Sequence, residues 1–506
     1  MNDGFALRWL IALPLIGSLF IYMLGRLVAR RAGDSSERNP AAWLALITLA
    51  CTGAALVFAF PPALAGTPET WQVGSVRLSL DGIGALLAAV VIGLSFFVTI
   101  FSMPYMRGEV GEEKFYALLV AMTGTIIGLG MSSDLFNLWV WFEAMAVTSY
   151  MLVAFYRQQP GSLEAGVKYL VQSASGSVLV LLGIALVFAQ SGTLELTAID
   201  TTTNSALSPL YLASGALFLI GFGVKIAVVP MHTWLPDAHS QAPSGISAML
   251  SGVVIEAGLV ALLRVLATLA GVQNSWGIFL LGFGAVNMLL GNLMALRQEQ
   301  VKRLLAYSSI SHIGYILLGI GVAIAFGSQA GGAGGFFHVI THALMKGLAF
   351  LCAGAFIYVL YLAHDSHKPL LKDDLNGTAK KYPLVAFAFS VALLGLGGLP
   401  PLAGFMSKWQ IFVAGFQTGN AWVMGLVIFA ALNSVLSLGY YTPLINRMYR
   451  HEAGTVVKQG AALPVLIGIP LAALAALVII LGIWPSLASW LTEPAGMILA
   501  AAFSSR

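Results

Sequence analysis

The amino-acid sequence predicts an all-α polytopic membrane protein with about fourteen transmembrane helices. Three observations lead to this prediction. Only 9% of the 506 residues are charged and 58% are hydrophobic, whereas about a quarter of the residues of a soluble domain are charged. The apolar residues form long runs, close to the ~20 residues that cross a bilayer. Basic residues also alternate with these runs in a regular way, as described below. A soluble multidomain protein is therefore excluded.

The composition also excludes several partners and cofactors. The net charge of +4 is small and the basic residues lie in short loops, so nucleic acid is not an expected partner. The two cysteines, Cys51 and Cys352, lie in apolar runs, which disfavours an iron–sulfur cluster or structural zinc. There is no P-loop and no strand–GxGxxG–helix for NADH, ATP or a flavin. We therefore expect no cofactor, no metal ion and no redox site in this chain.

Apolar segments between charged, glycine or proline breaks give the individual helices. The first run contains Arg26 near its end and is followed by Arg30 and Arg31, so it is predicted to be a retained helix rather than a signal peptide. The predicted spans are 9–28, 41–63, 81–104, 114–131, 134–155, 166–190, 208–229, 243–270, 275–296, 303–325, 335–361, 383–413, 421–445 and 463–491.

The distribution of lysine and arginine supports this count and predicts the orientation. The loops after odd-numbered helices, called the odd loops here, are rich in basic residues, whereas the even loops offer little beyond Arg77. Basic loops face the cytoplasm, so both termini are expected outside an energy-conserving plasma membrane. The basic residues of the odd loops and their flanks are Arg26, Arg30, Arg31, Arg38, Arg107, Lys114, Arg157, Arg297, Lys302, Arg303, Lys368, Lys372, Lys380, Lys381, Arg447, Arg450 and Lys458.

Two of the predicted helices are interrupted. The segments 225–236 in the seventh helix and 395–404 in the twelfth contain proline and glycine, which remove helical hydrogen bonds. Paired breaks in corresponding positions indicate inverted repeats with an ion path between them; the alternative is a kink or re-entrant loop without function. We expect two five-helix repeats, helices 4–8 and 9–13. The predicted units are helices 1–3 (1–110), the first repeat (111–271), the second repeat (272–448) and a fourteenth helix (449–506).

Several ionisable residues fall inside the predicted helices, where each costs at least ~2.5–3.5 kcal/mol in mid-bilayer and is a functional candidate. Glu143 and Lys225 have opposite charges in different helices and are expected to pair, either as part of an ion path or as a static ion pair. Lys168 is placed either in the interior or at the interface. The candidates for proton or ion transfer are Glu143, Lys225, Glu256 and Lys408, with Lys168 and Lys346 as relay candidates.

Histidines extend this pattern. His338, His342 and Lys346 are spaced i, i+4, i+8 and share one face of the eleventh helix. His312 in the tenth helix is either a relay residue or a hydrogen-bonded core residue. Because no Cys, Asp or Glu nearby supplies a third ligand, a metal site is disfavoured. The stripe is therefore interpreted as a proton relay, since histidine titrates near physiological pH.

Five segments together resemble a known family. They are DGIGALLAAVVIGLSFFVTIFSMPYM (81–106), MHTWLPDAHSQAPSGISAMLSGVVIEAGLVALLR (231–264), KRLLAYSSISHIGYILLGIG (302–321), HVITHALMKGLAFL (338–351) and GLPPLAGFMSKWQIF (398–412). They are similar to the antiporter-like subunits of complex I (M or ND4 type), of Mrp antiporters (D type) and of membrane-bound hydrogenases. The resemblance implies that Glu143 and Lys225 are the central glutamate and lysine, and that Lys168, His342, Lys346 and Lys408 occupy further sites of the path. One departure is Glu256, where the family usually has lysine.

The resemblance implies an ion-translocating subunit of a multisubunit complex, such as an NADH:quinone oxidoreductase-like translocase. Its expected partners are other membrane subunits, including other antiporter-like ones, the lipid bilayer, and protons, alone or with Na⁺. The hypothesis is that opening of the Glu143–Lys225 pair releases the lysine proton, which passes through Glu256, His338, His342 and Lys346 to Lys408. A stand-alone secondary solute transporter and a structural, non-pumping subunit are the alternatives.

Overall fold

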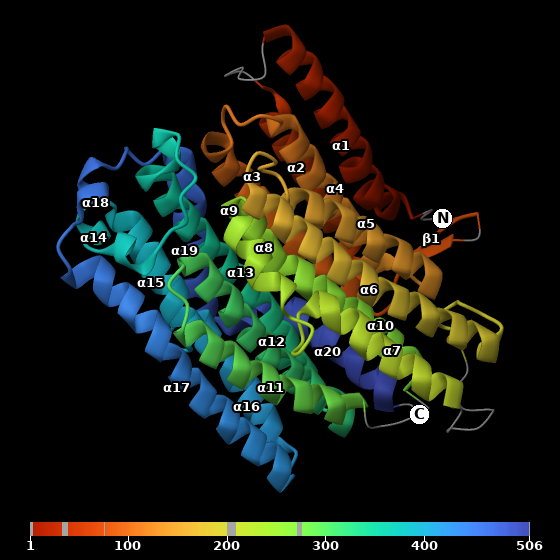
Figure 1. Cartoon of the computed structure of the whole chain (residues 1–506). Helices are drawn as coiled ribbons and strands as arrows, with labels where there is room; N and C mark the ends of the chain where they lie inside the picture. Colours follow the sequence, from red (N-terminus) through yellow and green to blue (C-terminus); the bar gives the residue numbers. More distant parts are fainter. Residues whose placement is uncertain (1–3, 33–38, 75, 200–208, 271–275, 505–506) are drawn as a thin grey trace.

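The computed structural model describes residues 4–32, 39–74, 76–199, 209–270 and 276–504. Within these ranges, thirteen helices are long and apolar enough to cross a membrane. Figure 1 shows them side by side in one bundle. The predicted twelfth helix, 383–413, is interrupted, and its two short halves together form a further crossing. The thirteen long apolar helices confirm the polytopic all-α fold. Arg38 and residues 200–208 of the first and sixth loops lie outside the described residues.

The N-terminal part comprises three membrane helices and a small hairpin that was not predicted. The elements are α1 (Phe5–Ala32), α2 (Ala41–Leu64), β1 (Thr70–Val73), β2 (Val76–Ser79) and α3 (Gly82–Tyr105). The two strands are antiparallel, with Thr70 opposite Ser79. Asp81 caps α3, because its side chain accepts a hydrogen bond from the Gly84 amide at 2.8 Å.

The first break lies where proline predicted it. This region contains α4 (Glu112–Met131), α5 (Leu135–Val153), α6 (Pro160–Ser191), α7 (Pro209–Ile226), α8 (Trp234–Gln241), α9 (Ser244–Met249), a π-helical turn (Leu250–Val254) and α10 (Ile255–Thr268). The chain is non-helical from 227 to 233. Neighbouring side chains satisfy the freed backbone groups: Trp234 Nε1 donates to the Val224 carbonyl at 2.7 Å, and the Val229 amide donates to Asn287 at 2.9 Å.

The second break divides the predicted twelfth helix into two halves. This region contains α11 (Trp276–Leu296), α12 (Val301–Phe326), α13 (Gln329–Leu360), α14 (Thr378–Lys381), α15 (Pro383–Gly397), α16 (Ala403–Gln417) and α17 (Ala421–Arg450). At 15 residues each, α15 and α16 are about 22 Å long, too short to cross a ~30 Å core alone. The segment 398–402 connects them.

The C-terminal part differs from the prediction of a single helix over 463–491. After the short α18 (Thr455–Gln459), α19 (Val465–Ile483) ends before Pro485, and a separate helix, α20 (Ser489–Ser504), follows. Helix α20 crosses one end of the bundle, where Trp490 contacts Phe60 of α2. There, a Cβ on Gly332 of α13 would lie 3.0 Å from the Gly496 Cα. Gly4 lies beside Thr70 and Trp71 at the same end, so both described termini are on one side.

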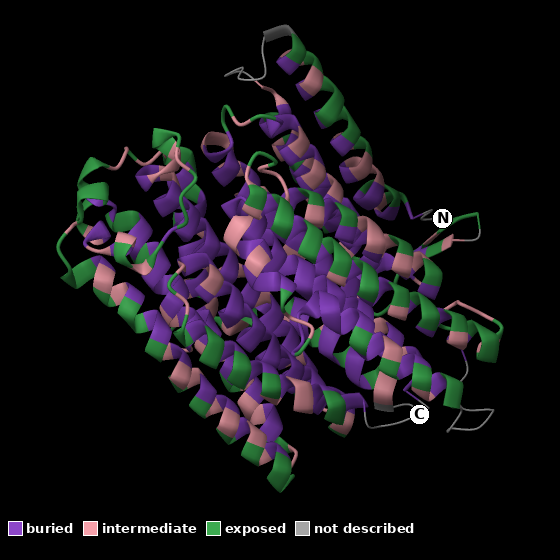
Figure 2. Cartoon of the chain, in the orientation of Figure 1, coloured by how far each residue is buried: buried purple, intermediate pink, exposed green. Residues whose placement is uncertain are grey.

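Burial identifies the helices that form the centre of the bundle. The most apolar window of the segment 244–268 is completely buried, and those of α12 and α13 are 89% and 83% buried. The corresponding values for α1, α2 and α17 are only 28%. Figure 2 shows the same contrast, with buried residues in the middle and exposed ones along α1 and α17. Ionisable groups in the middle of α10, α12 and α13, such as Glu256, His312 and Lys346, are therefore held inside protein, away from lipid.

One ion pair connects α10 to the start of α3. Arg264 donates to both carboxylate oxygens of Asp81, at 2.8 and 3.0 Å, and to the Gly130 carbonyl at 2.5 Å. Arg264→Ala is expected to destabilise the fold by roughly 1–3 kcal/mol, because the partly buried Asp81 would lose its counter-charge. The melting temperature in detergent measures the effect. The control is Arg77→Ala, whose pair with Glu195 is solvent-exposed. Equal shifts for the two variants would contradict this expectation.

Candidate functional site

Seven of the predicted site residues are brought together in the buried centre. They lie on α7, α10, α12, α13 and α16, and at most 3% of any of them is exposed; they are Lys225, Glu256, His312, His338, His342, Lys346 and Lys408. Glu143 is half-buried on α5, and Lys168 lies on the outer face of α6. Within the described ranges, no three His, Cys, Asp or Glu side chains are placed to hold a metal ion.

Lys225 occupies the last turn of α7, directly before the first break. Its Nζ donates to the Tyr169 hydroxyl at 2.8 Å and to Ser173 Oγ at 3.4 Å, and lies 4.5 Å from the centre of the Tyr169 ring. Tyr169 in turn stacks on Trp234 of α8, with ring centres 4.0 Å apart. Two hydroxyl groups and an aromatic face thus hold the lysine.

The predicted direct pair of Glu143 with Lys225 is not formed in this structure. Both residues are described, and no nitrogen–oxygen distance between them is within 4.0 Å. The Glu143 Oε1 atom is buried and has no hydrogen-bond partner in the part of the chain that the structure describes. The lysine side chain extends to α6 instead, where the hydroxyls of Tyr169 and Ser173 satisfy its donors. Glu143 still attracts the ammonium group at longer range.

Lys168 was predicted to lie either in the interior or at the interface. The structure places it at the protein surface, as the second alternative requires. Its side chain is 48% exposed and forms ion pairs with Glu164 at 2.7 Å and Asp237 at 3.1 Å. Arg303 binds the other oxygen of Asp237 at 2.7 Å. Lys168 is therefore separate from the buried centre, although it contacts α8 through Asp237.

Glu256 forms a buried pair with His342. Glu256 Oε1 and His342 Nδ1 are 2.8 Å apart, and both side chains are completely buried. The far atoms, Glu256 Oε2 and His342 Nε2, have no hydrogen-bond partner among the described residues. The π-helical turn ends immediately before α10, at Val254, a type of distortion that is frequent at functional sites. The pair can hold a proton on either partner.

Three histidines form a stacked group next to this pair. His312 Nδ1 and His338 Nε2 are 3.1 Å apart, and His338 Nδ1 is 2.8 Å from Ser407 Oγ on α16. The His312 ring stacks on His342, with centres 5.4 Å apart. His312 was predicted to be either a relay residue or a hydrogen-bonded core residue. In the structure it is hydrogen-bonded, and its partner His338 is itself titratable. Glu256, the three histidines and Ser407 thus connect α10 to the residue preceding Lys408.

Lys408 lies directly after the second break. Its Nζ donates to the Leu396 carbonyl at 2.9 Å and to Ser434 Oγ at 2.8 Å, and lies over the Tyr315 ring at 4.4 Å. Leu396 is in the last turn of α15, where carbonyl groups lack helical partners and carry partial negative charge. The interrupted helix therefore supplies the acceptor that a buried ammonium group requires.

Lys346 lies on α13 with His338 and His342, but it binds groups of α12 and not the histidines. Its Nζ donates to the Leu305 carbonyl at 2.9 Å and to Ser308 Oγ. Ser308 Oγ is 2.5 Å from the Tyr441 hydroxyl of α17. These contacts connect α13 to α12 and α17, in addition to the histidine group.

The sequence analysis missed several buried ionisable residues, among them His239 and Lys302. His239 of α8 is completely buried, stacks on Phe350, and neither ring nitrogen has a partner within the described residues. Lys302 is 3% exposed and donates to the Ala242 carbonyl at 2.5 Å. Lys302 was counted among the basic residues of an odd loop, because the predicted helix began at residue 303. Helix α12 begins at Val301, and a helical step of one residue turns Lys302 inward while Arg303 stays 35% exposed.

A small cavity of about 170 Å³ leads to these residues from the odd-loop side. Its lining includes Gln241, Gln300 and Lys302, together with His367 and Lys368 from the loop after α13. Lys302 and Lys346 both repel a positive charge on His239. Lys302 therefore joins the cavity to Ala242, the residue that follows α8, the helix that carries His239.

Comparison with known proteins places the chain in a family. Residues 132–434 match the family described as NADH:quinone oxidoreductase/Mrp antiporter, TM. Residues 73–116 match the family described as NADH-Ubiquinone oxidoreductase (complex I), chain 5 N-terminus.

Individual relatives and a solved structure agree. The chain is 32% identical to F(420)H(2) dehydrogenase subunit N of Methanosarcina mazei, over 86% of this chain and 87% of the relative. It is 33% identical to NADH-quinone oxidoreductase subunit N 2 of Roseiflexus castenholzii, over 85% and 87%. A chain of the archaeal membrane-bound sulfane sulfur reductase superposes with a TM-score of 0.86 at 28% identity, covering 99% of both. The chain therefore belongs to the NADH:quinone oxidoreductase/Mrp antiporter family of transmembrane subunits.

Proposed function

We propose that this chain translocates protons, alone or in exchange for Na⁺, as an antiporter-like subunit of a multisubunit membrane complex. Relatives that carry the names of subunits of F(420)H(2) dehydrogenase and NADH-quinone oxidoreductase support this assignment. Because no nucleotide- or flavin-binding motif is present in the sequence, other subunits supply the driving reaction. Because the odd loops are rich in basic residues and such loops face the cytoplasm, we place both termini outside an energy-conserving plasma membrane.

One observation carries the proposal: the buried centre between the two helix breaks holds a row of titratable groups, in which Glu256 and the three histidines are in contact. Gly258 of α10 lies against Lys225, since a Cβ at that position would be 3.2 Å from the lysine Cβ. From α10 the row continues through Glu256 and His342 to His312 and His338, and it ends at Lys408. Buried charges that only fixed helix register would not need such a continuous row.

The two helix breaks give the row its ends. We assign the observed conformation to the open form of the switch, because Lys225 contacts hydroxyl groups instead of Glu143. In the closed form the carboxylate stabilises the ammonium group. When the pair opens, the buried ammonium loses that attraction, and its proton passes to the Glu256–His342 pair. The cavity beside Lys302, followed by His239, is the proposed access from the odd-loop side.

We also propose that the chain contains two inverted five-helix repeats. Lys225 adjoins the break in the seventh helix and Lys408 adjoins the break in the twelfth, and each is held by uncharged groups of the protein. A buried lysine beside each break is what two copies of one five-helix unit would produce, with Lys225 before its break and Lys408 after its break. The units 111–271 and 272–448 each contain one such lysine.

A transport assay of the parent complex tests the function. Wild-type complex in proteoliposomes is expected to acidify or alkalinise the lumen when its driving reaction runs. Lys408→Met is expected to reduce this at least about tenfold, because the row loses its terminal proton carrier. Removing Na⁺ from both sides distinguishes proton transport alone from exchange. Lys380→Met, at an exposed position of the short helix α14, is the control. An unchanged rate for Lys408→Met with matched assembly would reject the proposal.

A further inference from the structure

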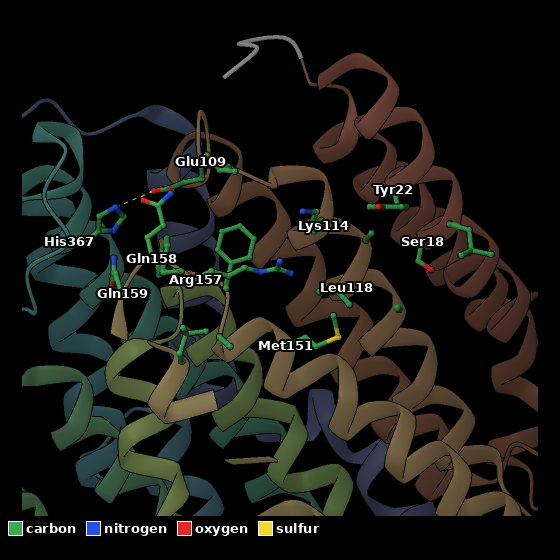
Figure 3. A pocket seen from close by; sticks show the side chains of 18 residues that line it. Ser18, Tyr22, Glu109, Lys114, Leu118, Met151, Arg157, Gln158, Gln159 and His367 are labelled. Carbon is green, nitrogen blue, oxygen red and sulfur yellow. Dashed lines mark ion pairs between the residues drawn. The ribbon is translucent and has the colours of Figure 1, made fainter. Parts of the chain in front are cut away.

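A large groove of the described chain lies outside the row of titratable groups. It has a volume of about 1160 Å³ and lies between α1, α4, α5 and the beginning of α6. Figure 3 shows Ser18 and Tyr22 of α1 on one side, Leu118 of α4 in the middle and Met151 of α5 on the other side. Its upper rim is formed by the loops after α3, α5 and α13, which are odd loops.

The walls of this groove are apolar and reach well into the membrane. They include Leu19, Ala117, Leu118, Ala121 and Met151. Ala121 lies nine residues beyond the start of α4, about 14 Å from the rim along the helix axis. Leu19 and Met151 are 64% and 43% exposed, so the groove is open toward the lipid side of the bundle. An occupant would therefore have a long apolar part.

The rim of the groove carries two cations without a counter-charge. Lys114 and Arg157 both line it, and neither side chain has an ion pair or hydrogen bond among the residues that the structure describes. Figure 3 shows both side chains near the upper end of the groove. The acid at the rim, Glu109, is paired with His367 at 3.8 Å. Burial raises the pKa of the Glu109 carboxyl, against the attraction of His367.

We propose that this groove binds one anionic glycerophospholipid from the leaflet on the odd-loop side. The headgroup phosphate lies between Lys114 and Arg157, and an acyl chain follows α4 between α1 and α5. Basic pockets between transmembrane helices on the cytoplasmic side are suited to anionic headgroups. A helix from a partner subunit would fill the apolar part, but it would leave both cations unpaired unless it carried acids at this level.

Titration of the full-length chain in detergent with two lipids tests the proposal. Native mass spectrometry measures binding of dioleoyl phosphatidylglycerol and of dioleoyl phosphatidylcholine, which have the same acyl chains. Wild type is expected to bind the anionic lipid more tightly. Lys114→Gln combined with Arg157→Gln is expected to weaken that binding about 30-fold, at ~1 kcal/mol for each basic residue, and to leave the zwitterionic lipid unaffected.

Two further variants separate charge from space. Arg297→Gln combined with Lys380→Gln removes two exposed basic residues of other odd loops and is expected to change neither affinity. Ala121→Trp fills the groove and is expected to weaken both lipids. The proposal is overturned if the Lys114/Arg157 variant binds the anionic lipid as wild type does, or if wild type does not distinguish the two lipids. A partner helix seen in the groove of the assembled complex would also overturn it.

Discussion

Replacing Lys225 with alanine is expected to abolish ion pumping while the parent complex still assembles. Lys225 adjoins the first break, and its Nζ is the proposed proton donor to the row. Alanine removes that donor without adding volume to the buried centre, so the rate should fall at least about tenfold. The measurement is proton movement driven by the intact complex in proteoliposomes, at equal amounts of assembled complex.

Lys168→Ala is the matched control for this variant. Lys168 is also a lysine of the first repeat, but its side chain lies at the protein surface with Glu164 and Asp237. It is expected to retain most of the pumping rate, because exposed ion pairs contribute ~0–1 kcal/mol. If Lys225→Ala pumps as fast as wild type, the chain is a scaffold or a silent module, and the proposed path is wrong.

The second large effect is expected for Glu256→Gln. Glutamine keeps the size of the side chain and a hydrogen bond to His342, but it cannot take up or release a proton. We therefore expect pumping to fall about tenfold or more with little change in stability. The pumping rate and the melting temperature of the same preparation provide the measurement.

Glu299→Gln is the control for the charge change, because Glu299 is an exposed acid whose nearest cation is Lys372 at 3.5 Å. It should leave both rate and stability unchanged. Full pumping by Glu256→Gln would mean that protons bypass α10, the helix that carries Glu256. Glu256 would then mark a weakly coupled copy of the family module, and not a carboxylate that replaces the lysine.

The sequence predicted the helices well because long apolar runs and basic loops are imposed by the bilayer. It also located both breaks, since proline and glycine act on the backbone wherever they occur. It missed α20, because the predicted last span ran past Pro485 without a break. It missed the β1–β2 hairpin, because two four-residue strands leave too short a pattern.

The candidate site was predicted in its members but not in all of its contacts. Membrane depth follows from position in a run, so Lys225, Glu256 and Lys408 were identifiable from the sequence. The direction of a side chain around the helix axis depends on packing against other helices. For this reason the expected contact between Glu143 and Lys225, both of which the structure describes, is not formed. For the same reason Lys302, which is buried, was taken for a loop residue. The sequence placed Glu256 and His342 on one proposed path, but it did not predict their direct contact.

The short helix α8 connects the surface of the protein to its centre. One side of it carries Trp234, which stacks on the tyrosine that binds Lys225. Another side carries Asp237, which is held from outside by Lys168 and Arg303. Attraction between such accessible charges weakens as ionic strength rises, whereas buried contacts are screened much less. We therefore expect the position of α8, and with it the environment of the buried Lys225, to respond to the salt concentration outside the bundle.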